Sequence, residues 1–229
     1  MNWANDQLLD SGPLPGFVVV EGPIGVGKTT LARRLASSFG SNLLLEAAEE
    51  NPFLEKYYEN PRSTALPTQL HFLLQRTRQL KMLRQEDMFN PVRVADFLIQ
   101  KDRLFAELTL NQDELDLYEQ VYANLTLDIQ KPDLVVYLQA PVEVLLTRIS
   151  KRGIKHEKWI EAAYLERLSD AYIQFFYQYK DAPLLIVNAA GIDFAHNDDD
   201  YALLLEQILD TRSGRHYFNP VAIQDMDCG

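Results

Sequence analysis

An α/β fold, built on a five-stranded parallel sheet with helices on both faces, is predicted by three features of the sequence. Short runs of apolar residues alternate with amphipathic helical stretches along most of the chain, as they do where strands are buried on both faces of a sheet. The first apolar run leads directly into a glycine-rich loop that opens a helix. Two later runs end on an acidic residue, at the edge of the sheet where ligands bind in such folds.

The glycine-rich loop is residues 22–29, Gly-Pro-Ile-Gly-Val-Gly-Lys-Thr, between the apolar run 17–20 and a helix. In that setting the pattern is typical of a phosphate-binding loop, whose backbone N–H groups converge on an anion at the start of a helix. Lys28 is expected to reach the outer phosphates and Thr29 to ligate Mg²⁺. The alternative is a glycine-rich turn without a ligand, which the flanking strand and helix disfavour. The expected phosphate-binding residues are Gly22, Pro23, Ile24, Gly25, Val26, Gly27, Lys28, Thr29 and Thr30.

The other elements follow from apolar periodicity and from the glycine and proline residues that interrupt it. The helix after the loop is expected to end at Phe39, because Gly40 suits a helix C-terminus. The expected strands are residues 17–20, 43–46, 92–96, 134–138 and 184–188. The expected later helices are residues 67–85, a long helical region to about residue 129, and residues 141–151, 158–179 and 201–209.

Glu46 and Asp96 end the second and third expected strands. Because the carboxyl ends of parallel strands lie at one edge of a sheet, both carboxylates and the loop 22–29 are expected to face a single crevice. An acidic residue can end a strand for reasons unrelated to function. The neighbouring phosphate loop favours a functional role for these two.

Composition limits the function. The 229 residues suffice for one substantial core, and 1–229 is expected to be one domain with an irregular leader at 1–15 and an irregular tail at 212–229. A formal charge of −11 argues against a nucleic-acid partner, which requires a basic surface. Cys228 is the only cysteine, and the sequence shows neither a membrane span nor a signal-peptide pattern, so a cytoplasmic location is expected.

The reaction class is indicated by residues that the strands lack. Motor and switch proteins usually carry an Asp at the end of a strongly apolar strand, or an Asn-Lys-x-Asp motif. The apolar strand at 134–138 is instead followed by Gln139 and Ala140, with no acid. This favours phosphoryl transfer to a small molecule, which is catalysed by alignment, Mg²⁺ and mobile cations. The segment 148–157 offers such cations in Arg148 and Arg152, with a solvated basic helix end as the alternative.

Further motifs carry a family resemblance. Residues 46–53 read Glu-Ala-Ala-Glu-Glu-Asn-Pro-Phe, and Tyr58 in Lys-Tyr-Tyr-Glu is followed eleven residues later by Gln69. The other matching positions are Arg76, Asp96, Asp102-Arg103, Arg148, Arg152, Glu157 and Asp193-Phe194. From Phe17 to about Leu209 the chain resembles the deoxynucleoside kinase family. The resemblance implies a P-loop kinase fold, ATP and Mg²⁺ as cofactors, and phosphorylation of the 5′-hydroxyl of a deoxynucleoside.

The resemblance also implies roles on the substrate side. Glu46 would be the general base for the 5′-hydroxyl, and Tyr58 with Glu157 would hold the 3′-hydroxyl. Gln69 would pair with the base, because a Gln amide offers both a donor and an acceptor. The remaining substrate-binding residues are expected to be Phe72, Arg76 and Asp102.

On the donor side, the resemblance implies that Arg148 and Arg152 act with Lys28 on the transferring phosphoryl group. Asp193 and Phe194 would cradle the adenine of ATP. The residues expected to support the metal are Thr29 and Asp96.

The chain departs from the family pattern at three positions. Ala47 replaces a proline after the base, Phe97 replaces the arginine of an Asp/Glu-Arg-Ser motif, and Ile154 replaces a second lid arginine. Two positive charges near the transferring phosphoryl group are therefore missing. Lys101, or Lys155 in the lid, is the hypothetical replacement.

Three functions remain open at this point. The first is a deoxynucleoside kinase, with purine substrates favoured because bacterial members of similar sequence often act on deoxyadenosine or deoxyguanosine. The second is a thymidylate-type nucleoside monophosphate kinase, in which Arg76 would bind the acceptor phosphate. The third is a non-catalytic nucleotide-binding subunit.

The family tends to form homodimers through helices, and the aromatic stripe from Leu165 to Tyr179 could be either an interface or core.

Overall fold

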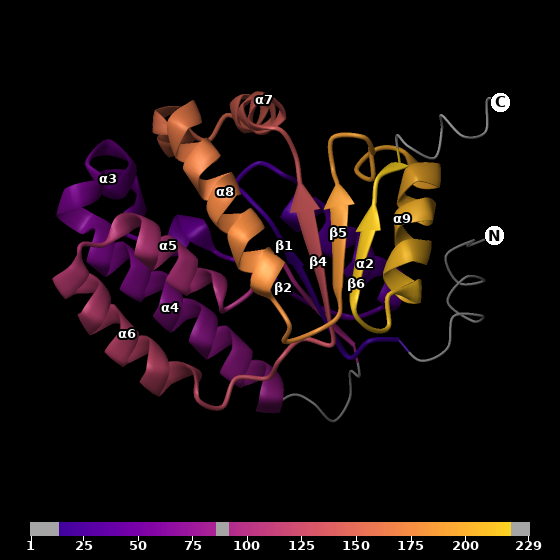
Figure 1. Cartoon of the computed structure of the whole chain (residues 1–229), viewed down its shortest axis with the longest axis horizontal. Coiled ribbons are helices and arrows are strands. Elements are labelled where there is room, and N and C mark those ends of the chain that lie inside the picture. Colours follow the sequence, from indigo (N-terminus) through magenta and orange to yellow (C-terminus); the bar gives the residue numbers. More distant parts are fainter. Residues whose placement is uncertain (1–13, 86–91, 221–229) are drawn as a thin grey trace.

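A six-stranded parallel sheet forms the centre of the computed structural model, which describes residues 14–85 and 92–220 (Figure 1). The strand order is β2-β3-β1-β4-β5-β6, with every neighbouring pair parallel. The five predicted strands are all present, and the predicted α/β class is confirmed. The strands are β1 (Phe17–Glu21), β2 (Asn42–Leu44), β3 (Arg93–Ala95), β4 (Leu134–Gln139), β5 (Leu184–Asn188) and β6 (Arg215–Phe218).

The sixth strand corrects the prediction of an irregular tail at 212–229. Residues Arg215–Phe218 pair in parallel with β5 at the edge of the sheet. In this strand Phe218 is buried, whereas His216 and Tyr217 are exposed, so the segment lacks the continuous apolar run that identified the other strands. Residues 221–229 of the tail and residues 1–13 of the leader lie outside the described residues.

Helices cover both faces of the sheet, as predicted. In Figure 1 helix α8 crosses in front of the sheet, α2 lies behind it, and α3 to α6 form a group on the side away from α9. The helices are α2 (Lys28–Phe39), α3 (Leu54–Glu59), α4 (Pro61–Gln85), α5 (Lys101–Thr109), α6 (Gln112–Thr126), α7 (Val142–Arg152), α8 (Ala162–Gln178) and α9 (Asp198–Asp210), with 3₁₀ turns η1 (Ala48–Glu50) and η2 (Lys155–Trp159).

Two helix boundaries differ from the prediction for local reasons. The expected long helical region to residue 129 is divided, because Asn111 caps a new helix by accepting from the Glu114 backbone N–H while Glu114 accepts from that of Asn111. Helix α4 begins six residues before Pro67, at Pro61, since proline suits the first turn of a helix. By contrast, α2 ends at Phe39 as predicted. Gly40, the next residue, has a left-handed conformation with φ of 59°.

The aromatic stripe of α8 belongs to the core. Leu165, Leu168, Tyr172 and Phe176 are buried, and the Phe176 ring stacks on Tyr137 of β4 with the ring centroids 4.1 Å apart. These four side chains are therefore occupied within the chain and are not free to form a subunit interface. In the described parts of the chain, no helix combines the length and apolarity needed to cross a membrane.

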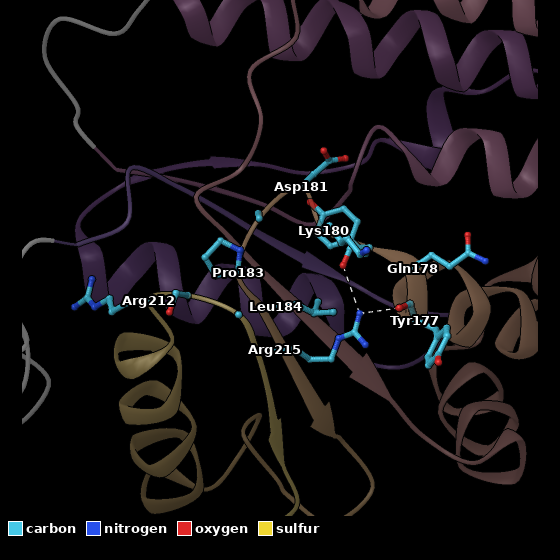
Figure 2. A pocket seen from close by; sticks show the side chains of 12 residues that line it. Tyr177, Gln178, Lys180, Asp181, Pro183, Leu184, Arg212 and Arg215 are labelled. Carbon is cyan, nitrogen blue, oxygen red and sulfur yellow. Dashed lines mark hydrogen bonds between the residues drawn. The ribbon is translucent and has the colours of Figure 1, made fainter.

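The β6 segment also holds the end of α8 in place. Arg215 donates through Nη2 to the carbonyl oxygen of Phe176 at 2.8 Å and to that of Tyr177 at 2.9 Å, and Figure 2 shows the bond to Tyr177. These carbonyls belong to the last turn of α8, whose partial negative charge favours a cation. Arg215 thus ties the edge strand to the helix that packs over the middle of the sheet.

We expect Arg215→Met to lower the free energy of unfolding by about 1–3 kcal/mol, because charge-assisted hydrogen bonds to helix carbonyls are lost. Urea denaturation followed by far-UV circular dichroism measures the change. Lys180→Met, at an exposed position beside the same helix end, is the matched control and should differ little from the unmodified protein. Equal midpoints for all three proteins would show that β6 does not stabilise α8.

Candidate active site

The phosphate loop links the end of β1 to the start of α2. Gly22, Gly25 and Gly27 all have positive φ, at 151°, 83° and 109°. A Cβ atom on Gly22 would lie 2.4 Å from the carbonyl oxygen of Leu138, so a side chain is excluded at that position. The predicted loop therefore has the backbone that only glycine adopts readily, with its N–H groups at the start of α2.

Lys28 lies against its own loop. Its Nζ donates to the carbonyl oxygens of Gly22, at 2.8 Å, and Pro23, at 3.2 Å. Burial lowers the pKa of Lys28 from 10.5 to about 8, and the nearby charge of Lys101 contributes to the same shift. The ammonium is thus held mainly away from water, beside a second cation, which favours the binding of an anion here.

Asp96 connects the phosphate loop to the segment after β2. Its Oδ2 accepts from the Thr29 hydroxyl at 2.5 Å, and its Oδ1 accepts from the backbone N–H of Glu46 at 2.7 Å. The predicted convergence of Glu46, Asp96 and the loop is therefore present. A hydroxyl and a carboxylate beside a phosphate loop fit Mg²⁺, which binds one or two carboxylates together with phosphate oxygens.

Glu46 is the acid between the two halves of the crevice. Lys101 Nζ donates to its Oε2 at 3.0 Å, and Arg76 Nη2 donates to its Oε1. Arg76 also pairs with Asp102, which is almost fully buried. Burial lowers the pKa of Arg76 to about 10. Glu46 therefore lies between two cations.

The acceptor side is a pocket of about 580 Å³. Every residue predicted to bind the substrate lines it except Asp102, which lies behind Arg76. Gln69 Nε2 donates to the Thr109 hydroxyl at 3.3 Å, and the Arg76 guanidinium lies 4.8 Å from the centre of the Phe72 ring. The predicted residues lining the pocket are Glu46, Tyr58, Gln69, Phe72, Arg76 and Glu157.

Tyr58 and Glu157 both line the acceptor pocket. Burial raises the pKa of the Tyr58 hydroxyl, and the charge of Glu157 raises it further. Arg152 of α7 pairs with Glu157 through both Nε and Nη2. These contacts bring the predicted sugar-binding pair next to a lid arginine.

The donor side is a second pocket, of about 500 Å³. It is lined by the loop from Gly25 to Thr30, by Arg148 and Arg152, and by the segment that contains Asp193 and Phe194. Arg148 donates to the carbonyl oxygens of Val26 and Ala189, at 2.9 and 2.8 Å. Lys28, Thr29 and Arg152 line both pockets, so the donor and acceptor sides form one continuous crevice.

Sequence reasoning missed Glu21. This side chain is fully buried, and its Oε1 accepts from the Gly22 N–H at 2.8 Å and the Tyr172 hydroxyl at 3.0 Å. Its Oε2 accepts from the Leu98 N–H at 2.7 Å and lies 3.7 Å from Lys101 Nζ. The signal was in the sequence, because Glu21 ends the first strand as Asp96 ends the third.

The two candidate replacement lysines differ in position. Lys101 lines the acceptor pocket and contacts Glu46. Lys155 is exposed in η2 and is not among the residues that line either side of the crevice. Ile154 does line the acceptor pocket, so the departure from the family pattern leaves an apolar contact there.

A larger concavity, of about 1070 Å³, lies at the opposite edge of the sheet (Figure 2). It is lined by Leu184 and Arg215, the first residues of β5 and β6, and by the end of α8. In a parallel sheet this amino-terminal edge faces away from the phosphate loop, which follows the carboxyl end of β1. The smaller crevice, with its paired acids and cations, is therefore the candidate active site.

Comparison with known proteins identifies the family. The family model described as deoxynucleoside kinase matches residues 18–212. The chain belongs to the deoxynucleoside kinase family. A deoxyguanosine kinase from Bacillus subtilis (strain 168) is 39% identical over 193 residues, which are 81% of this chain and 92% of the relative. A deoxyguanosine kinase from Lactobacillus johnsonii is 30% identical over 206 residues, 84% of this chain and 90% of the relative.

The solved structure of deoxyadenosine kinase from M. mycoides with bound dATP superposes with a TM-score of 0.73 at 26% identity, covering 83% of this chain and 97% of that one. The predicted resemblance and the P-loop kinase fold are confirmed, apart from the sixth strand. As a deoxynucleoside kinase, the protein is an enzyme that transfers a phosphoryl group from ATP to a deoxynucleoside. This rules out the third function considered above, a non-catalytic subunit.

The pKa of Lys28 leads to a prediction for nucleotide binding. Above about pH 8 the free protein loses this positive charge, whereas a bound phosphate favours the ammonium form and raises the pKa. ATP binding at about pH 8.5 should therefore take up protons, and binding at about pH 6.5 should take up almost none. Calorimetry in buffers of different ionisation enthalpy measures the uptake. Lys28→Arg, whose cation does not titrate in this range, should reduce it; equal uptake at both pH values would contradict the assignment.

Proposed function

We propose that this kinase phosphorylates the 5′-hydroxyl of a purine deoxynucleoside, deoxyguanosine or deoxyadenosine, in the cytoplasm. The observation that carries the proposal is the position of Glu46, whose backbone is bonded to Asp96, which in turn is bonded to Thr29 of the phosphate loop. A carboxylate is thus fixed at the junction of the donor and acceptor pockets. The purine preference is supported by relatives that are themselves deoxyguanosine and deoxyadenosine kinases.

On the acceptor side, we assign base recognition to Gln69 and to Arg76, which Asp102 orients. Tyr58 and Glu157 would hold the 3′-hydroxyl, so a sugar without that hydroxyl would leave buried polar groups unpaired. Phe72 would pack against the face of the base. These groups place the 5′-hydroxyl near Glu46.

In the transfer step, Glu46 takes the proton of the 5′-hydroxyl as the 5′-oxygen bonds to the γ-phosphorus. The bond from that phosphorus to the β,γ-bridging oxygen breaks, and ADP leaves. Lys28, Arg148 and Arg152 would neutralise the charge on the phosphates, with the backbone N–H groups of residues 22–30 as additional donors. Asp193 and Phe194 would contact the adenine.

Mg²⁺ would be held by Thr29 and Asp96, together with phosphate oxygens of ATP. When bound, it supplies neutralisation of charge on the β- and γ-phosphates. In the structure Asp96 already orients the Thr29 hydroxyl towards its own carboxylate, so both ligands lie together before nucleotide enters.

Glu46→Gln is expected to lower kcat by about 10²- to 10⁴-fold, because an amide cannot accept the proton. ADP formation is measured with deoxyguanosine, deoxyadenosine, deoxycytidine and deoxyguanosine monophosphate as acceptors. The unmodified enzyme should prefer the two purine deoxynucleosides. Full activity of Glu46→Gln, or preference for the monophosphate, would instead favour a nucleoside monophosphate kinase, which needs no base.

We also propose that the enzyme is a homodimer that associates through α4 and α6. The support is a set of exposed apolar side chains on these two helices, where Met82 is 59% and Leu117 is 49% exposed. Exposed apolar groups on adjacent helices favour burial against a second copy. Leu74 of α4 adds to the same set.

The double variant Met82→Lys, Leu117→Lys should sediment as a monomer in analytical ultracentrifugation, whereas the unmodified protein should sediment as a dimer. Leu203→Lys, at a 51% exposed position on α9, is the matched control and should remain dimeric. A monomeric unmodified protein, or a double variant that stays dimeric, would disprove this interface.

A further inference from the structure

We propose that Lys101 is a catalytic residue of this kinase and that Glu21 is the positioning residue that holds its ammonium beside Glu46. The inference deepens the proposed function, because it takes Glu46 to be the general base. It begins from two buried charged groups: Glu21 is fully buried and Lys101 is 2% exposed. Charges this deep are costly unless each has a partner, so their pairing fixes where they lie.

Glu21 is held by groups from three parts of the fold. The Gly22 N–H belongs to the phosphate loop, the Leu98 N–H to the segment after β3, and the Tyr172 hydroxyl to α8. With these donors in place the carboxylate has little freedom. Its Oε2 lies 3.7 Å from Lys101 Nζ, so the position of the ammonium is set relative to the phosphate loop itself.

Lys101 extends from the first residue of α5 into the acceptor pocket. Its Nζ lies 3.0 Å from Glu46 Oε2, on the opposite side from Arg76. Both lysines line this pocket, and the charge of Lys101 is close enough to lower the pKa of Lys28. The two ammonium groups therefore stand on either side of the place where the phosphoryl group is transferred, Lys28 on the donor side and Lys101 on the acceptor side.

The chemistry gives Lys101 a role that changes during the step. Before transfer, Glu46 is an anion and Lys101 neutralises it. When the proton of the 5′-hydroxyl moves to Glu46, the carboxylate loses its charge while negative charge remains on the oxygens of the transferring phosphoryl group. Lys101 keeps its own protons throughout, and its charge is then available to those oxygens, which is the stage at which a cation lowers the barrier.

The position of Lys101 also compensates for Phe97, which stands where the family has an arginine. That side chain is buried in the apolar core, where it cannot supply a charge to the crevice. Lys101, four residues later, contacts the base directly, whereas the exposed Lys155 is not among the residues that line the crevice. The structure thus favours Lys101 of the two candidate replacements.

Lys101→Met tests the catalytic role. We expect kcat to fall by about 100-fold or more, the effect of removing one donor to a developing charge, with little change in the affinity for ATP. The melting temperature should fall as well, because Glu21 loses its buried cation, so kcat is measured at a temperature where the variant is folded. Lys155→Met should retain turnover, and Lys158→Met, at another exposed lid lysine, is the matched control. Unchanged turnover of Lys101→Met, or loss in Lys155→Met instead, overturns the proposal.

A second measurement separates lost charge from lost packing. In Lys101→Ala, added methylammonium should restore part of kcat in proportion to its concentration, whereas methanol, which has a similar size and no charge, should not. Lys101→Ala is also the fallback if Lys101→Met does not fold. Equal rescue by both compounds, or rescue by neither in a folded variant, would indicate a packing role and reject catalysis by Lys101.

Glu21→Gln tests the positioning role through a double-mutant cycle. The amide keeps the shape of the side chain but removes the charge that holds Lys101, so kcat should fall. In the Lys101→Met background the same change should have no further effect on kcat, because Glu21 acts through Lys101. Independent, additive losses would reject this role. If Lys101→Met is active while Glu46→Gln is inactive, only this inference fails; if Glu46→Gln is active, the proposed function fails.

Discussion

The two hydrogen bonds accepted by Asp96 are the interaction on which the active site depends. One oxygen of this carboxylate holds the Thr29 hydroxyl and the other holds the Glu46 backbone, so a single side chain fixes the distance between phosphate loop and base. Strand order makes the link short, because β3 lies between β1 and β2 in the sheet. The carboxyl ends of three adjacent strands thus deliver the groups that phosphoryl transfer has to align.

Charge balance explains how so many ionised groups coexist in the crevice. Three acids in or beside the crevice have a cation next to them: Glu21 has Lys101, Asp102 has Arg76, and Glu46 has both. Burial is the largest cause of the lowered pKa values of Lys28 and Lys101. Keeping these two groups charged therefore costs free energy while no anion is bound. ATP brings the negative charge that offsets this cost, and binding energy is therefore available for alignment.

Most of the fold could be predicted from the sequence, since β1, β4 and β5 are continuous apolar runs and the loop after β1 has a fixed spacing. The edge strand β6 could not, because only Phe218 of its last three residues is buried. In the site, the predicted residues other than Gly22, Pro23 and Asp102 do line the crevice, but the pairs they form were not predictable. The contact between Arg76 and Glu46 joins residues thirty positions apart through the packing of α4 against the sheet edge. Glu21 was overlooked although it follows the first apolar run as Asp96 follows the third, because the expected first strand was ended at Val20.

The pairing of Arg76 bears on the class of acceptor. A nucleoside monophosphate kinase needs a cation that is free to bind the acceptor phosphate, and Arg76 was the residue considered for that task. Here its guanidinium already contacts two carboxylates, Glu46 and Asp102. An incoming phosphate would meet those two negative charges at close range and would have to displace one of them, with the other left near it in a buried site. A neutral nucleoside meets no such repulsion, and its base can accept hydrogen bonds from an arginine that stays paired. The charges around Arg76 therefore favour an acceptor that carries no phosphate, in agreement with a carboxylate base at the point of transfer.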